Sequence, residues 1–438
     1  MNMPNRYLTH LFLVVLLLVQ GAGADTSAYE DAADLDASNI LPADIVDGEH
    51  HSVESRVRND GYLNYYSIHS DYGEFDVTST AMLRVRIGEI NALAELEELS
   101  KTEVFVQAAA DAGVKQLKSL QQFATHPVET VKGIPSGVGR MFKRFTRQAG
   151  EAVDATKEFV AGDDGEAGDE NSEEDGEDAD DSNVAVDLTE SYLGVDKAQR
   201  NWSRKLGTDP YSSNEVLQAA IKEFAWAERL GKFGMGFAGV PKIPGADIIS
   251  DVNEAVWSKD PYELRDLNYS RLVATGADEA LIEEYLDNPR MTPSQQTLLT
   301  AAIAEFEGVD GRDGILKQSL NPETDAEMNF FIRSLTLLAW YHHNQNPLTS
   351  VATSDAIPVA ILQNGTAVLA FATDHLYWTE SVAQAADNYI GSGGDGQPRE
   401  LWLLGTASDR ALTALKEKGF DVYVGVATLL TENDNIDE

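Results

Sequence analysis

Three residues near the carboxyl end of the chain could perform acyl-transfer chemistry. Asp374 and His375 follow one apolar run, and Ser408 follows another. A hydroxyl nucleophile, a histidine base and a carboxylate that orients the histidine form a hydrolytic site when the fold brings them together. The nucleophile motif G-x-S-x-G is absent, and Ser408 is also well placed to cap a helix. We therefore assign no catalytic residue and keep these three as candidates.

A second group of residues could bind an anionic surface. Between residues 130 and 150 the chain has five basic residues and no acidic one, and phenylalanines recur along the same predicted amphipathic helix. Basic side chains attract anionic lipid headgroups, while phenylalanine inserts at the acyl boundary. The candidate membrane- or partner-binding residues are Lys132, Arg140, Phe142, Lys143, Arg144, Phe145 and Arg147.

The same helix could instead pack against the rest of the protein. Residues 163–181 include 12 acidic residues and no basic one. Their carboxylates are close enough in sequence to neutralise the basic face of the helix, whose apolar face would then lie in a core. The acidic tract itself is expected to be disordered, because like charges repel and no large apolar residue is present to form a core.

No cofactor or metal site follows from the sequence. Residues 234–239 match G-x-G-x-x-G, but helical periodicity precedes them, and Pro241 and Pro244 exclude a helix after them. His342 and His343 are adjacent on a predicted helix and point about 100° apart, so they cannot ligate one metal ion together. A Walker loop, an EF-hand loop and H-E-x-x-H are also absent from the sequence.

The first 24 residues have the pattern of a cleavable secretory signal. Residues 11–19 form an apolar run too short to span a bilayer, and Ala22-Gly23-Ala24 supplies the small residues that a signal peptidase recognises. The chain contains no cysteine, which favours a bacterial exported protein without disulfides. We expect export to the periplasm or, alternatively, to the extracellular space. No second long apolar segment follows, so no transmembrane span is expected in the mature chain.

The net charge of −40 limits the kinds of molecule that the protein can be expected to bind. The chain has 73 acidic and 33 basic residues. A broad nucleic-acid interface needs many lysine and arginine contacts with phosphates, so nucleic-acid binding is not expected. An anionic lipid surface or another envelope protein remains the expected partner, through residues 130–150.

Strand signals come first along the chain and helix signals follow. Residues 52–58, 62–69 and 74–78 are rich in strand-forming residues and predict a three-stranded meander. From Thr80 the apolar spacing becomes helical. Amphipathic helices are therefore predicted from there to residue 160.

The chain after the acidic tract is predicted to be helical at first. Ser212 with Glu215 has the pattern of a capping box, and so has Asp260 with Glu263. Residues 323–343 are the most apolar of these helices, which indicates a central helix buried on all sides.

The last part of the chain has the pattern of a small mixed sheet. Asn364-Gly365 between two apolar runs is a strong hairpin signal. Two helices and two further strands alternate after this hairpin. The predicted strands are 357–363, 366–373, 400–404 and 420–427, and the predicted helices are 379–390 and 408–418.

These observations predict an α+β fold of several units. It contains an N-terminal β-meander with amphipathic helices, a central all-α domain and a small C-terminal mixed α/β sheet of order β-β-α-β-α-β. We expect an exported, soluble envelope protein with a binding or scaffolding role; the alternative is a hydrolase-type enzyme built around His375 and Ser408. The predicted boundaries are 1–24 (signal peptide), 25–49 (disordered leader), 50–160 (meander and helices), 161–186 (disordered linker), 187–350 (helical domain), 351–430 (α/β domain) and 431–438 (acidic tail).

Overall fold

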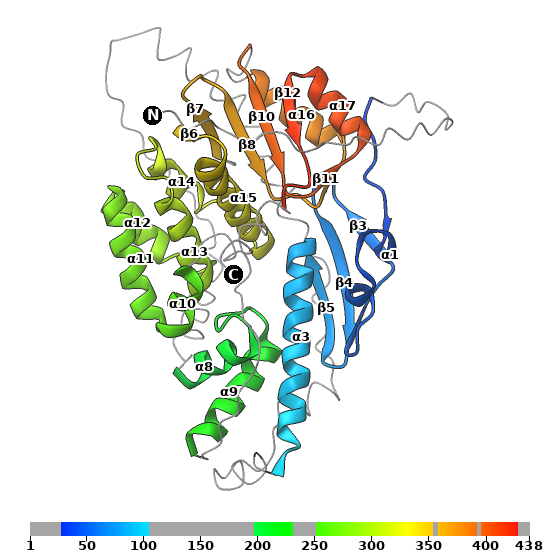
Figure 1. Cartoon of the computed structure of the whole chain (residues 1–438), viewed down its shortest axis with the longest axis vertical. Helices are drawn as coiled ribbons and strands as arrows, with labels where there is room; N and C mark the ends of the chain where they lie inside the picture. The colour runs from blue at the N-terminus through cyan, green and yellow to red at the C-terminus, as the bar shows by residue number, and fades with distance from the viewer. Residues whose placement is uncertain are drawn as a thin grey trace, which may run out of the picture.

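The computed structural model describes residues 28–103, 105, 197–230, 251–353, 358–391 and 396–427 (Figure 1). They form N-terminal strands, a central group of helices and a C-terminal mixed sheet. The predicted α+β class, with its parts in this order, is therefore confirmed. Over these residues, no helix is both long enough and apolar enough to cross a membrane.

The N-terminal sheet is built around one long central strand. That strand, β4 (Asn64–Ser70), pairs antiparallel with three others, and Gly73 makes the tight turn after it at φ 126°, a conformation that favours glycine. The predicted first strand is two strands, which pair with different parts of β4. The other strands are β1 (Leu35–Asp36), β2 (His51–Val53), β3 (Arg56–Asn59) and β5 (Gly73–Thr78).

The predicted disordered leader needs correction over residues 35–46. Strand β1 pairs with β3, and two short helices follow it, α1 (Ala37–Ile40) and α2 (Ala43–Val46). Ala37 is fully buried and Leu41 nearly so. These elements are too short to produce a periodic pattern, and contact with the sheet stabilises them.

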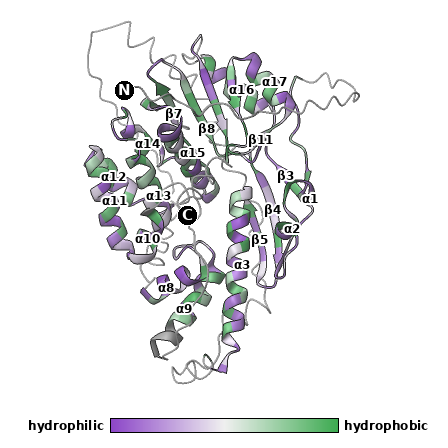
Figure 2. Ribbon diagram, in the orientation of Figure 1, coloured by the Kyte–Doolittle hydropathy of each residue, from purple (hydrophilic) through white to green (hydrophobic). Residues whose placement is uncertain are grey.

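A long helix, α3 (Thr80–Ser100), lies along the N-terminal sheet (Figure 1). Figure 2 shows hydrophobic and hydrophilic residues alternating along it, as expected for a helix with one buried face. Helix α9 (Glu215–Leu230) packs against α3, and α8 (Lys197–Leu206) packs against α9; both helices come after the predicted linker. One hydrophobic core therefore joins the N-terminal sheet to the first helices of the predicted helical domain.

The remaining helices form the central group, and several begin at the predicted signals. The capping box of Asp260 and Glu263 is present, and the most buried helix is α15 (Asp325–Asn344), close to the predicted range. The others are α10 (Asp251–Ser258), α11 (Pro261–Thr275), α12 (Glu279–Leu286), α13 (Pro293–Ala304) and α14 (Arg312–Gln318).

The C-terminal sheet has the strand order β12-β10-β8-β7-β6. The predicted hairpin at Asn364-Gly365 joins β7 (Pro358–Leu362) to β8 (Ala367–Phe371), and β8, β10 and β12 are parallel. Strand β6, which was not predicted, is the fifth strand of this sheet and pairs with β7. Helix α15 lies on one face, and α16 and α17 on the other (Figure 1). The further elements are β6 (Leu348–Thr353), β9 (His375–Leu376), α16 (Glu380–Tyr389), β10 (Arg399–Leu403), β11 (Thr406–Ala407), α17 (Asp409–Glu417) and β12 (Phe420–Tyr423).

A second core contains the central helices and the C-terminal sheet. Tyr62 and Leu63, from the turn before β4, are also buried in this core. The two cores thus run across the boundaries expected from the sequence, because residues from the N-terminal part are buried in both.

Candidate functional site

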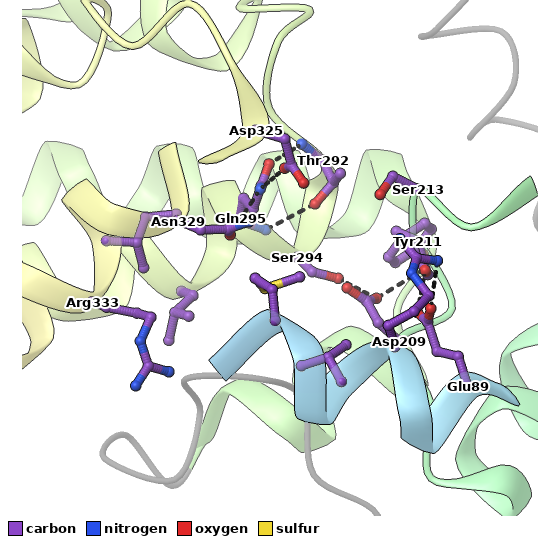
Figure 3. A pocket seen from close by; sticks show the side chains of 16 residues that line it. Glu89, Asp209, Tyr211, Ser213, Thr292, Ser294, Gln295, Asp325, Asn329 and Arg333 are labelled. Atoms are coloured by element: carbon purple, nitrogen blue, oxygen red, sulfur yellow. Dashed lines mark hydrogen bonds and ion pairs between the residues drawn. The ribbon is translucent and has the colours of Figure 1, made fainter. Parts of the chain in front are cut away.

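A pocket lined by both polar and apolar side chains lies where α3 meets α13, α15 and the loop 207–214 (Figure 3). Its volume is about 70 Å³, several times the roughly 10–15 Å³ that one water molecule needs. Met82, Val85 and Leu298 contribute apolar surface, while exposed Ser213 and Asp325 belong to its open side. The pocket is therefore large enough for a few water molecules or a small polar ligand.

Glu89 attaches the loop 207–214 to α3 on one side of the pocket. This buried carboxylate on α3 accepts hydrogen bonds from Arg86 Nη1 (2.7 Å), from Asn214 Nδ2 (3.0 Å) and from the Ser212 hydroxyl. Three donors satisfy its two oxygens, and the guanidinium balances its charge. Glu89 therefore holds the loop against α3 and has little capacity left for a ligand.

The predicted capping box of Ser212 and Glu215 is wrong, because Ser212 is engaged by Glu89. The Ser212 hydroxyl donates to Glu89, and the side chain of Asn214 instead accepts from the N–H of Leu217 at 3.3 Å. A contact with a carboxylate 123 residues away thus replaces the local cap. Local spacing cannot reveal such a contact.

Asp209 is a second carboxylate that lines the pocket, and it has spare hydrogen-bonding capacity. Its Oδ1 accepts hydrogen bonds from the Ser294 hydroxyl (2.5 Å) and from the backbone N–H of Tyr211 (2.8 Å). Within the described parts of the chain, no hydrogen bond is found to its Oδ2. One carboxylate oxygen is therefore left for a ligand or for water.

The surroundings of Asp209 disfavour its charged form. Burial raises its pKa to about 6, and the nearby carboxylates of Glu89 and Asp325 act in the same direction, while the bonds from Ser294 and Tyr211 oppose the shift. Above this pH the group is a carboxylate with an unused acceptor, and below it the group is neutral. The pocket thus changes its charge near neutral pH.

The far side of the pocket is formed by α13 and α15. Gln295 Nε2 donates to Asp325 Oδ1 (2.7 Å) and to Asn329 Oδ1 (3.1 Å), which fixes the two helices to each other (Figure 3). One turn further along α15, Arg333 also lines the pocket, and its charge lowers the pKa of Asp374. The lining therefore offers charges of both signs.

Asp374, one of the candidates for acyl transfer, is used as a structural link. Its buried carboxylate accepts the backbone N–H groups of Asn64 (2.9 Å) and Thr80 (3.0 Å), which belong to the N-terminal sheet and to the first turn of α3. Burial raises its pKa, and these bonds and Arg333 lower it. Both oxygens of Asp374 are engaged, so it does not orient His375 in this arrangement.

His375 and Ser408 lie on neighbouring strand ends but have different partners. His375 Nδ1 is 2.7 Å from the Thr406 hydroxyl, and the Ser408 hydroxyl donates to Glu30. Ser408 also caps α17, accepting from the N–H of Ala411 at 3.0 Å. Over the described residues no hydrogen bond joins His375 to Ser408. The structure therefore brings the predicted residues close together without forming a triad.

The other candidates lie outside the described residues. These are the basic residues and phenylalanines between 130 and 150, the glycine motif at 234–239, the predicted signal and the acidic tract. His342 is described, and its Nδ1 accepts from the N–H of Leu348 at 2.9 Å, while His343 pairs with Glu305 at 2.8 Å. The two histidines therefore have separate partners.

Sequence analysis missed the pocket, because its polar residues are far apart in the chain and none forms a motif. Comparison with known proteins adds no analogy: no protein-family model, no curated protein and no solved structure matches this chain.

Proposed function

We propose that this protein is an exported binding protein that holds a small polar ligand in the pocket between α3, α13 and α15. The observation that carries this proposal is the Asp209 carboxylate, which has one oxygen engaged by Ser294 and Tyr211 and the other without a donor in the described structure. Asp209 is half-buried, so its second oxygen is within reach of a ligand, and a donor on the ligand can form a charge-assisted hydrogen bond with it.

The chemistry of the pocket favours a ligand with a protonated amine. Asp209 is ionised above pH 6, and the net charge of −40 raises the local concentration of cations. Glu89 is already paired with Arg86, so the ligand's charge is met by Asp209.

Calorimetric titration with small primary amines, amino alcohols and uncharged polyols tests this proposal. We expect an amine to bind at pH 8 and to lose affinity below pH 6. Asp209→Asn should abolish the preference for amines over polyols, whereas the matched control Asp325→Asn, at the exposed side of the pocket, should keep it. Equal binding of amines by the wild-type protein and Asp209→Asn would refute the proposal.

A second candidate role rests on the composition of residues 130–150. Five basic residues without an acidic one suit contact with anionic lipid or an envelope partner, at about 1 kcal/mol for each basic residue near a lipid surface. Replacing Arg140, Lys143, Arg144 and Arg147 with glutamine should abolish binding to anionic liposomes at low salt. If the wild-type protein and a variant lacking residues 163–181 both ignore such liposomes, this role is excluded.

The hydrolase alternative requires a rearrangement. The Ser408 hydroxyl would have to leave Glu30 and reach His375, whose ring now contacts Thr406. Ester hydrolysis that survives both Ser408→Ala and Thr406→Val would exclude this alternative, and loss in only one variant would identify the hydroxyl used.

A further inference from the structure

The parallel strands β8 and β10 end side by side, at the edge of the C-terminal sheet formed by their carboxyl ends. The proposed binding pocket lies elsewhere. After these strands, β9 and β11 pair through His375 with Thr406 and Leu376 with Ala407, and the chain then enters α16 and α17. In open α/β sheets, ligands bind outside the carboxyl ends of the strands, where helix N-termini favour anions.

A carboxylate from the N-terminal segment already lies on this edge. Glu30 Oε1 accepts hydrogen bonds from the N–H of Trp378 (2.5 Å) and from the hydroxyl of Ser408, so that it bridges the two loops. The backbone is held as well, since Glu30 N–H donates to the carbonyl of Trp378 at 3.0 Å. Glu30 is 348 residues from Trp378 and 378 residues from Ser408. This contact is therefore purely tertiary.

The rest of this N-terminal segment is held weakly. From residue 28 to residue 34 no residue is fully buried, although Tyr29 is only 38% exposed. Its other contacts include an exposed ion pair of Asp34 with Arg56 (2.8 Å) and a bond between the backbone of Ala33 and Tyr377. Exposed ion pairs contribute little to stability, so the Asp34 pair adds little to the attachment that Glu30 provides.

We propose that residues 28–34 form a releasable strap whose Glu30 carboxylate occupies the position of an anionic ligand. A ligand bearing a carboxylate or a phosphate group takes the same two donors, Trp378 N–H and Ser408 O–H, and displaces Glu30. The strap then leaves the edge of the sheet, because no buried side chain retains it. His375 lies within electrostatic range of Glu30.

The test compares the full-length wild-type protein with Glu30→Gln and with the neighbouring control Asp31→Asn, which removes one charge from the same exposed segment. Acetate and inorganic phosphate are titrated separately at constant ionic strength and followed by NMR. Because Glu30 competes with the anion, Glu30→Gln should bind one of them about tenfold more tightly or better, while Asp31→Asn should match the wild type. The anion that binds identifies the group, carboxylate or phosphate, that the edge prefers.

Hydrogen exchange gives an independent readout. In Glu30→Gln the amide of Trp378 should exchange about tenfold faster or more, since its acceptor has lost its charge, and adding the anion to the wild type should accelerate protease cleavage between residues 28 and 34. The proposal is overturned if the three proteins bind both anions equally, if Glu30→Gln shows no saturable binding, or if the strap stays equally protected. None of these outcomes involves Asp209, so failure here leaves the amine-binding pocket unaffected.

Discussion

The carboxylate of Asp374 accepts a hydrogen bond from the backbone N–H of Thr80 at 3.0 Å, across 294 residues of sequence. It thereby joins the end of β8 to the first turn of α3, where the helix dipole favours a negative charge. The same carboxylate accepts from the N–H of Asn64, so that the N-terminal sheet is attached at this point as well.

Substitutions of Asp374 should therefore lower the free energy of unfolding, by an amount that depends on how many of its hydrogen bonds are lost. Asp374→Ala leaves two buried N–H groups without acceptors and should lower the free energy of unfolding by about 2–5 kcal/mol. Asp374→Asn keeps an acceptor for one N–H group and places an amide N–H against the other, so it should cost about half as much. Urea unfolding of the three proteins measures this order. A neutral Asp374→Ala would show that the junction is not held by this carboxylate.

Ser79, the residue before Thr80, is predicted to be strained. It has φ 80° and ψ 146°, and it is the one non-glycine residue with positive φ among the described residues. Ser79→Gly should raise the free energy of unfolding by about 1 kcal/mol, because the relief of strain exceeds the few tenths lost with the cap to Met82. Ser79→Ala should lower it by about 1 kcal/mol, since the strain stays and the cap is lost. Thermal and urea unfolding distinguish the two, and equal effects would contradict a strained Ser79.

Asp209 should make stability depend on pH in a defined direction. Its pKa is raised from 3.8 to about 6, so between these values the folded protein binds more protons than the unfolded chain, and the contribution of this group to stability falls as pH rises. Asp209→Asn keeps the bonds of Ser294 and Tyr211 through its amide oxygen. It should therefore be more stable than the wild type by about 1–3 kcal/mol at pH 8, with the difference vanishing near pH 4.

Urea unfolding at pH 4, 6 and 8 measures this difference. As a control, Asp31→Asn, at an exposed residue far from the pocket in sequence, should alter stability by less than about 0.5 kcal/mol at each pH. A gain from Asp209→Asn that is largest at pH 4 would contradict the sign of the shift.

The N-terminal sheet and the helices beyond the acidic tract should stay together when the chain is cut between them. Phe105 stacks on Phe224 of α9 with ring centroids 4.4 Å apart, and both rings are buried in the core shared with α3. After cleavage by an acid-specific protease within residues 106–196, the two pieces should co-elute in size-exclusion chromatography. Separation without denaturant would contradict the shared core.

Phe224→Ala should weaken the same association. The cavity it leaves should lower the free energy of unfolding of the intact protein by about 3–5 kcal/mol. Tyr262→Ala, at a residue that is 63% exposed, serves as the control and should change it by less than about 0.5 kcal/mol. Urea unfolding of the intact variants, followed by chromatography of the cut ones, tests both statements.

The sequence by itself determined the features that depend on neighbouring residues. Asp260 and Glu263 cap a helix three residues apart, and Asn364-Gly365 turns one strand into the next. The apolar residues of α15 mark it as central whatever surrounds it. Each of these features is set by hydrogen bonds or periodicity within one or two turns of chain, which is the range that local spacing reports.

Only the tertiary structure decided which polar groups meet. Ser212 lies in a capping pattern but donates to Glu89. Asp374 comes after a strand, and its carboxylate binds the first turn of α3. Glu30 lies in a segment without any sequence pattern, and it bridges two loops. A polar side chain can be satisfied by any donor or acceptor within reach, and burial of the two cores determines which ones come within reach. The pocket around Asp209 arises in the same way, from elements that only the packed cores bring together.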